Sequence, residues 1–268
     1  MMLKNSIPVL LLSLAAAVPA HAKGKHAFTF GGAVENYNYK EPKLMETKGK
    51  HFYGLEAGYR FQATSRLVYG LEARYMRGKT SYKSNSTGRH GTKTPNRIFE
   101  SRGLLSGVFK PFDTTALEPF TGLGYRLKKD SDEGRRTSTG HYGYKRESQY
   151  WYIPLGARLV HTLNQSWSLA MKGEYDFLLR GRQKSWGSVM PKDKHTQKKG
   201  YGLKGEVMAT CNMGHFDLSF GPYIHYWNIK NSDKNYHHFV HKGAKYEYFT
   251  HEPKNRTTET GAAVRVTF

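Results

Sequence analysis

Lysine and arginine gather in long polar segments from which acids are nearly absent. Segment 77–97 contains no acid, and the next acid in the chain is Glu100. Segment 180–200 contains a single acid, Asp193. Clusters of this kind create a positive potential that attracts polyanions and accelerates association, with a strong dependence on salt. The candidate anion-binding residues are Arg77, Lys79, Arg89, Lys93, Arg180, Arg182, Lys192, Lys194, Lys198 and Lys199.

Histidines are the second group with chemical potential. His237, His238 and His241 stand close together, and imidazole nitrogens are common ligands of zinc and copper. Their spacing matches no defined metal site. The sequence therefore predicts neither a metal nor a cofactor. A metal site formed by these three histidines is the alternative.

Catalytic motifs are hard to find. There is no Gly-x-Ser-x-Gly elbow and no glycine-rich phosphate loop. Asp176 and His225 are expected to face the same interior and could approach one another, although a histidine with satisfied hydrogen bonds is the simpler explanation. The sequence therefore predicts a protein that is not an enzyme.

The elements that must carry these residues are strands with two different faces. In segment 53–61, Tyr53, Leu55, Ala57, Tyr59 and Phe61 share one face, and glycines alternate with Glu56 and Arg60 on the other. Segments 69–75 and 201–207 repeat the pattern. Apolar residues that alternate with a face of glycines and charges of both signs are typical of a membrane-spanning β-barrel with a crowded lumen.

Ten such segments are predicted, joined by connections that alternate between short and long. Short turns against long loops, with an even strand number and both termini in the periplasm, are typical of outer-membrane barrels. Eight strands are the alternative count, and the first strand, with Asn36 and Asn38 facing outward, is the least typical. The predicted strands are 26–39, 51–62, 66–77, 97–110, 118–128, 148–161, 166–181, 200–211, 215–228 and 257–268, and the predicted long loops are 40–50, 78–96, 129–147, 182–199 and 229–256.

The inward face carries acids and bases in similar numbers. Charges confined in a narrow lumen need partners, because an unpaired one costs several kcal/mol. We therefore expect a network of ion pairs that fills the lumen rather than an open pore. Its members are Glu35, Glu56, Arg60, Glu72, Arg74, Glu100, Arg102, Arg126, Arg158, Lys172, Glu174, Asp176, Lys204, Glu206, Asp217, Glu259 and Arg265.

Both ends of the chain fit export to the outer membrane. Lys4, an apolar stretch from Ile7 to Ala20 and an Ala-His-Ala ending predict a signal peptide at 1–22, followed by one barrel domain at 23–268. The apolar stretch is shorter than the roughly 18 to 20 residues of a membrane-spanning helix. The alternation in 261–268 runs to Phe268. This resembles the terminal strand of bacterial outer-membrane proteins, through which the barrel-assembly machinery recognises them.

The predicted fold is all-β: a closed, antiparallel transmembrane β-barrel of about ten strands. This layout is similar to that of the omptin surface proteases and of the Opc-type adhesins that bind sulfated glycosaminoglycans. The second resemblance implies a non-enzymatic surface protein whose basic loops bind lipopolysaccharide or a sulfated or sialylated host glycan. A small porin-like channel with anion preference and a surface hydrolase of omptin or lipid A type are the alternatives. Outer-membrane lipid is an expected partner, and no dedicated nucleic acid partner is expected.

Overall fold

The structure, a computed structural model, describes residues 25–188, 190–241 and 244–268, so the predicted signal peptide lies outside it. Strands dominate this part of the chain, and none of it forms a helix long and apolar enough to cross a membrane. The wall strands are β1 (His26–Glu41), β2 (Met45–Gln62), β3 (Leu67–Ser84), β5 (Thr94–Gly107), β7 (Thr115–Ser131), β8 (Lys145–Thr162), β9 (Trp167–Gly187), β11 (Gly200–Asn212), β12 (Asp217–Ile229) and β15 (Asn255–Thr267).

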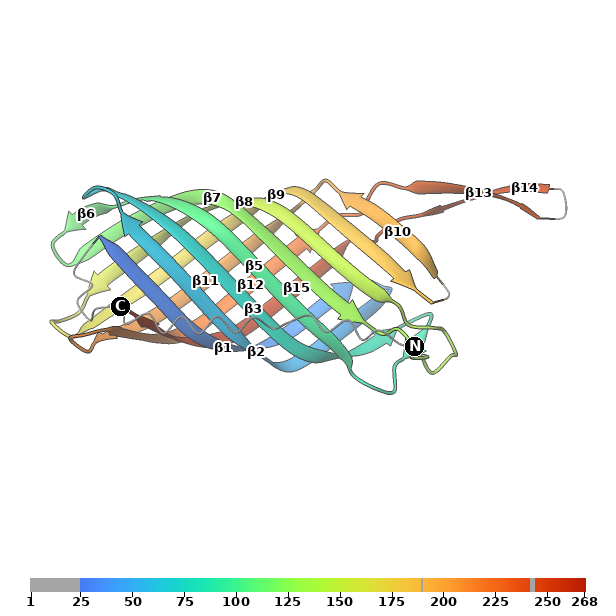
Figure 1. The fold of residues 1–268 in the computed structure, drawn as a ribbon, viewed down its shortest axis with the longest axis horizontal. Coiled ribbons are helices and arrows are strands. Elements are labelled where there is room, and N and C mark those ends of the chain that lie inside the picture. The colour runs from blue at the N-terminus through green and yellow to red at the C-terminus, as the bar shows by residue number, and fades with distance from the viewer. Residues whose placement is uncertain (1–24, 189, 242–243) are drawn as a thin grey trace, which may run out of the picture.

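These ten strands close into an antiparallel barrel in which each strand pairs with its neighbours in the chain (Figure 1). The barrel closes where β1 pairs with β15 over twelve register positions from Thr29 to Lys40. Since β1 pairs with β2 on its other side, the predicted count of ten is confirmed and the alternative of eight is wrong.

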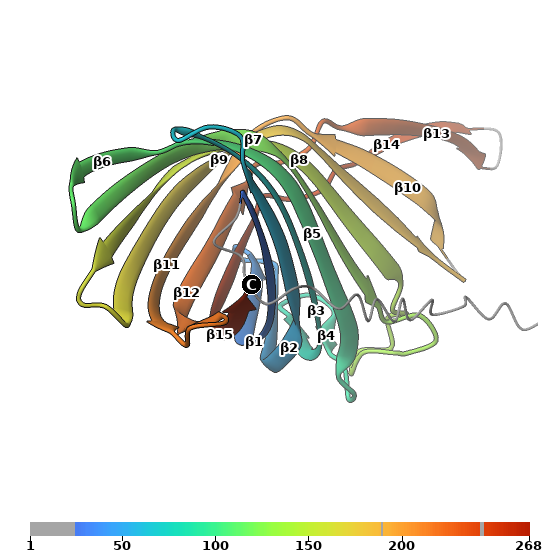
Figure 2. The ribbon, with the colours of Figure 1, turned by 60° about the vertical axis from the view of Figure 1, so that its left-hand side comes forward.

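Shorter strands extend the barrel at both of its ends. β6 (Phe109–Phe112) pairs with β7, whereas β4 (Gly88–Arg89) and β10 (Met190–Gln197) pair with β3 and β9 at the opposite end. The hairpin of β13 (Asn235–His241) and β14 (Ala244–Thr250) projects beyond the barrel (Figures 1 and 2). The C-terminus lies at the end with the short turns, which we call the turn end, and the other is the loop end.

The wall is longer than the sequence predicts. Connection 40–50 is a hairpin in which only residues 42–44 lie between β1 and β2, and in 182–199 the strands β9 and β10 pair with each other. The alternation simply continues: Tyr37, Tyr39 and Glu41 stay inside while Asn38 and Lys40 face out. Because the outward face becomes polar here, the apolar half of the pattern disappears and the strand looks like a loop in sequence.

An outward band of exposed apolar side chains surrounds the wall; we call it the belt. Aromatic residues mark its loop-end border, as is usual where a barrel meets the membrane surface. These border residues are Tyr53, Tyr75, Phe99, Trp151 and Phe177. We call the part of the protein beyond these border residues the extension. It comprises residues 36–52, 77–97, 128–149, 180–199 and 228–256, as far as they are described.

Candidate functional site

The acids of the extension are turned inward or already paired. Glu41, Asp130, Asp132 and Glu252 are buried inside it. Those nearer the surface form ion pairs: Glu46 with Lys48, Glu133 with Lys145, Glu147 with Lys129 and Lys184, Asp193 with His195, Asp233 with Lys198, and Glu247 with His238. The outer surface of the extension therefore presents cations with little acidic charge beside them.

The predicted anion-binding residues all lie on this outer surface. Arg77, Lys79, Arg89, Lys93, Arg180, Lys192, Lys194, Lys198 and Lys199 are exposed, and Arg182 is half-buried. Of this set only Lys198 forms an ion pair with a described residue. Two of the cations lie over aromatic rings, Arg77 at 4.9 Å from the ring centre of Tyr53 and Lys192 at 6.0 Å from that of Trp186. The distribution of charge around them favours an anionic ligand.

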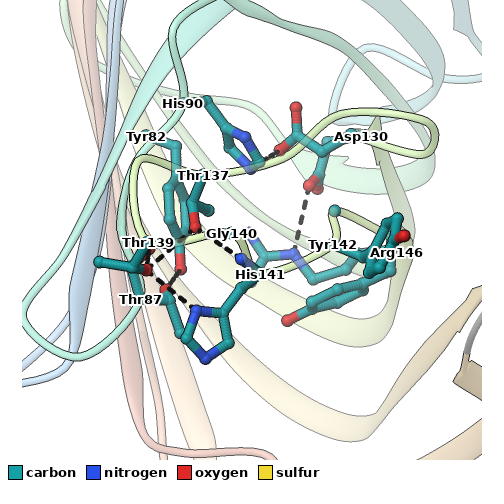
Figure 3. A pocket seen from close by; sticks show the side chains of 13 residues that line it. Tyr82, Thr87, His90, Asp130, Thr137, Thr139, Gly140, His141, Tyr142 and Arg146 are labelled. Atoms are coloured by element: carbon teal, nitrogen blue, oxygen red, sulfur yellow. Dashed lines mark hydrogen bonds and ion pairs between the residues drawn. The ribbon is translucent and has the colours of Figure 1, made fainter.

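A pocket of about 560 Å³ opens between the loops that follow β3 and β7 (Figure 3). Residues 137–139 are tied to 87–89, since the Ser138 amide donates to the Arg89 carbonyl at 2.7 Å and Thr139 Oγ1 donates to the Thr87 carbonyl at 2.8 Å. The single hydroxyl hydrogen of Thr139 is thereby used. In its 2.9 Å contact with His141 the Nδ1 of the histidine must be the donor, which leaves Nε2 as an acceptor.

Aromatic rings and hydroxyls line this pocket. Tyr82, Tyr142 and Tyr144 border it together with Thr87 and Thr137. Its volume lies within the range of about 300–1,000 Å³ usual for small-molecule sites.

A buried acid pair that the sequence pattern did not predict is linked to this pocket through Arg146, which lines the pocket and pairs with Glu41. The Tyr39 hydroxyl donates to Glu41 at 2.8 Å and lies 3.5 Å from the Glu252 carboxyl. Burial, followed by the nearby Glu41 carboxylate, raises the pKa of Glu252 to about 8. The Tyr39 hydroxyl is thus directed at both carboxyl groups, and Arg146 holds Glu41 from the other side at 3.3 Å.

The structure brings the predicted lumen charges together in one network. At mid-height Arg74 pairs with Glu35 and Glu259, Arg126 with Glu100 and Glu259, and Lys204 with Glu100, Glu174 and Asp176. Nearer the turn end Arg102 pairs with Glu72 and Glu174, Arg265 with Glu56 and Glu206, Arg60 and Arg158 with Glu118, and Lys172 with Glu174. Asp217 lines the cavity of about 440 Å³ that remains there, and it forms no ion pair with a described residue. Glu118 is a member that the sequence reasoning missed.

A layer of large apolar side chains lies above the network on the loop-end side. Tyr37, Phe52, Tyr152 and Trp227 are at most 1% exposed. Glycine makes room for them: a Cβ on Gly78 would stand 2.2 Å from the Phe52 ring, and one on Gly124 would stand 2.1 Å from the Tyr152 ring. Tyr37 stacks on Phe52 and Tyr152 packs edge-on against Trp227, so two pairs of rings occupy this part of the lumen.

The Asp176–His225 couple does not form. Asp176 lies 3.4 Å from Lys204, whereas His225 lies 3.5 Å from Glu259. In the register of the wall Asp176 is level with Gly202 and His225 is level with Lys204, so the two side chains face the same lumen at different heights. The alternative of a catalytic couple at these residues was wrong.

A different Asp–His pair occurs at the loop end, on β10. His195 Nε2 lies 2.9 Å from Asp193 Oδ2, and Asp193 also accepts hydrogen bonds from Thr250 at 2.7 Å and Asn235 at 3.1 Å. Burial opposes ionisation, but these hydrogen bonds and His195 outweigh it and lower the pKa of Asp193. His195 is buried and its Nδ1 faces Asn235, so the pair ties the β13–β14 hairpin to β10.

The loop histidines do not converge. His237 bonds to Thr250 at 3.0 Å and stacks on Tyr248, while His238 pairs with Glu247. The side chain of His241 lies outside the described part. Among the side chains that are described, no group of three histidine, cysteine or acidic residues is arranged to hold a metal ion.

Fold and surface together define a transmembrane β-barrel of the bacterial outer membrane. A family model described as an outer membrane protein beta-barrel domain matches residues 9–180. The chain belongs to this family. No curated protein sequence matches it.

The solved structures that resemble this one are distant in sequence. The outer membrane protease OmpT from Escherichia coli is 12% identical, covers 91% of this chain and 96% of its own, and superposes with a TM-score of 0.56. The outer membrane protein OprG from Pseudomonas aeruginosa is 11% identical, with 92% and 98% coverage and a TM-score of 0.41. The Pseudomonas putida toluene transporter TodX is 10% identical, with 92% and 90% coverage and a TM-score of 0.38. At these identities the likeness concerns the fold alone.

Proposed function

We propose that this protein is a non-enzymatic surface barrel that binds an anionic glycan through the outward cations of the extension. In this proposal the loop end is extracellular, both termini are periplasmic, and the ligand is lipopolysaccharide or a sulfated or sialylated glycan. The observation that carries it is the separation of charge: the acids of the extension are buried or paired, while Lys79, Lys192 and Lys194 are exposed without an acidic partner.

The pocket shown in Figure 3 supports a glycan over other polyanions. Tyr142 and Tyr144 offer ring faces for sugar rings, and His141 Nε2 offers an acceptor for a sugar hydroxyl. The cations around the extension hold the phosphate, sulfate or carboxylate groups of the same chain. Stacking would set the position of the glycan, and charge would set the rate and salt dependence of its binding.

The alternatives find less support. A porin-like channel needs a continuous lumen, and the layer of Tyr37, Phe52, Tyr152 and Trp227 fills it. The Asp193–His195 pair gives no support to a surface hydrolase, because His195 is buried with both ring nitrogens engaged.

A salt series tests the proposal. Binding of heparin and of lipopolysaccharide to the refolded full chain is measured from about 50 to 500 mM salt, a range over which the screening length shortens several-fold. We expect the affinity to fall steeply, and K192Q/K194Q/K199Q to weaken low-salt binding about tenfold. R66Q/K110Q, which removes exposed cations at the turn end, is the control and should bind like the wild type. Binding that is absent at low salt, or indifferent to salt, would refute the proposal.

A further inference from the structure

Two arginines stand directly opposite one another on the outward face of the wall. Arg77 of β3 and Arg97 of β5 are register partners, and Arg97 is in turn the register partner of Lys129 on β7. All three are exposed. Opposite positions of an antiparallel pair are about 4.5–5.5 Å apart, and like charges there destabilise the sheet.

No acid in the described part of the chain forms an ion pair with Arg77 or Arg97, whereas Lys129 pairs with Glu147 at 3.0 Å. The register partners that flank the three cations are Tyr53 on β2 and Glu147 on β8. The Arg77 guanidinium lies over the Tyr53 ring, on the side of β3 away from Arg97. The two arginines thus occupy adjacent register positions without an acid between them, and an anion from outside would offset the charge that they share.

The height of Arg77, Arg97 and Lys129 along the barrel axis indicates the source of that anion. Two residues along each strand toward the turn end, Tyr75 and Phe99 belong to the aromatic border of the belt. The arginines are therefore the first outward residues above the apolar surface, the level at which the charged headgroups of a bilayer lie. The Arg77 guanidinium lies 4.9 Å from the ring centre of Tyr53, which keeps it along the wall at this height.

The chemistry of the two side chains selects phosphate. A guanidinium is planar, always charged, and presents paired N–H donors that match the oxygens of a phosphate group. Two guanidinium groups opposite each other can grip one phosphate from both sides, and Lys129 adds a third cation beside them.

We infer that Arg77 and Arg97, with Lys129, bind a phosphate group on a glycolipid of the leaflet that surrounds the loop end. The inference rests on the proposed function for the orientation of the barrel, and it concerns a membrane-level site distinct from the distal cations. A bound phosphate replaces the repulsion between the arginines by attraction of both to the phosphate. Substitution of one arginine should therefore lower the thermal stability of the protein when phosphate is bound, and maintain or raise it when phosphate is absent.

Another like-charged pair supplies a control. Lys40 and Arg256 are register partners on β1 and β15 and are both exposed, but Lys40 has Glu46 as its register partner on the other side. This pair also lies several residues beyond the belt, whose last outward apolar residue on β1 is Val34. The R256Q variant removes one charge from such a pair away from the membrane surface.

The test uses the full chain in vesicles that contain either diphosphorylated lipid A or the same lipid with its phosphates removed. Thermal unfolding is followed for the wild type, R97Q and R256Q, and lipid retention is measured by native mass spectrometry. We expect R97Q to unfold at the same or a higher temperature than the wild type in the dephosphorylated lipid, and at a lower temperature in the phosphorylated one. Retention of phosphorylated lipid A should fall about tenfold in R97Q, as for loss of one charge-assisted hydrogen bond, and stay unchanged in R256Q.

Three results would overturn the inference. The first is equal destabilisation by R97Q in both lipids, which would make Arg97 a structural residue of the wall. The second is unchanged retention of phosphorylated lipid in R97Q. The third is protection of the wild type by inorganic phosphate to the same extent as by the lipid, which would identify a soluble anion as the ligand. Loss of heparin binding with an intact lipid effect would remove the proposed glycan function and leave this site standing.

Discussion

The buried acid pair makes the closed form of the loop end sensitive to pH. Glu252 lies beneath the base of the β13–β14 hairpin, where its amide donates to Ser232 Oγ at 2.8 Å and its carbonyl accepts from the Ser232 amide at 3.0 Å. Its folded-state pKa of about 8 is raised above the ordinary 4.5. The proton is thus bound more tightly when the segment is closed, and the stability that it contributes is complete below pH 4.5 and lost as the pH rises to 8.

The size of the effect follows from that window. A shift from 4.5 to about 8 corresponds to on the order of 5 kcal/mol for complete exposure of the group. The value of about 8 already includes the favourable effects of Arg146 and the Tyr39 hydroxyl. Local opening exposes the carboxyl only in part, so about 2–3 kcal/mol is the expectation for opening of the segment. This equals roughly a 30- to 160-fold increase in the open population between pH 5 and pH 8.

Hydrogen exchange of segment 244–256 measures this opening, after correction for the intrinsic effect of pH. In Glu252→Gln the extra opening at pH 8 should vanish, because an uncharged amide occupies the buried position at every pH. Glu247→Gln, which changes a largely exposed acid of the same hairpin, is the control. The difference between the variants, rather than the pH dependence of either one, is the decisive quantity. A pH dependence that is identical in the wild type and Glu252→Gln would refute the reasoning.

Two more predictions concern the lumen. In planar bilayers the wild type should show no steady conductance, whereas Phe52→Ala combined with Trp227→Ala should admit current, since both rings are fully buried in the apolar layer of the lumen; a conducting wild type would show that the layer is no seal. Lys204→Met should lower the free energy of unfolding in urea by about 3–5 kcal/mol, because Glu100, Glu174 and Asp176 lose the cation that they share. Lys110→Met, at an exposed site, should change little, and equal stability of the two variants would argue against a paired network.

The barrel itself was predictable because the membrane imposes a strict pattern. Lipid on one side and a confined polar lumen on the other force alternation along every strand, as in Tyr53 to Phe61. Short turns and the terminal strand ending at Phe268 fixed the strand count. The same rule failed above the belt, where water replaces lipid: in β3 both the outward Lys79 and Lys83 and the inward Thr80 are polar, so no alternation is visible.

The ion-pair partner of a lumen residue was less predictable than the face of the strand on which that residue lies. Alternation gives the direction of a side chain, but its height depends on the register and tilt of each strand around the whole barrel. Asp176 and His225 were therefore expected on the correct face and at the wrong level. Glu41 and Glu252 flank the Tyr39 hydroxyl although 211 positions separate them, since the closing pair of β1 and β15 brings the end of β1 next to the segment that precedes β15.

The arrangement of charge links the stability of this barrel to its surface. Each acid that the wall places inside, such as Glu35, Glu100 or Glu259, neutralises a lumen cation and so does nothing to offset the cations outside. Consequently the formal net charge of +21 for the full chain is carried mainly by residues outside the lumen. Lys192 and Arg97 balance no acid inside the barrel, so substitutions at these residues should act through the bound glycan and the bound lipid, each at its own height above the membrane.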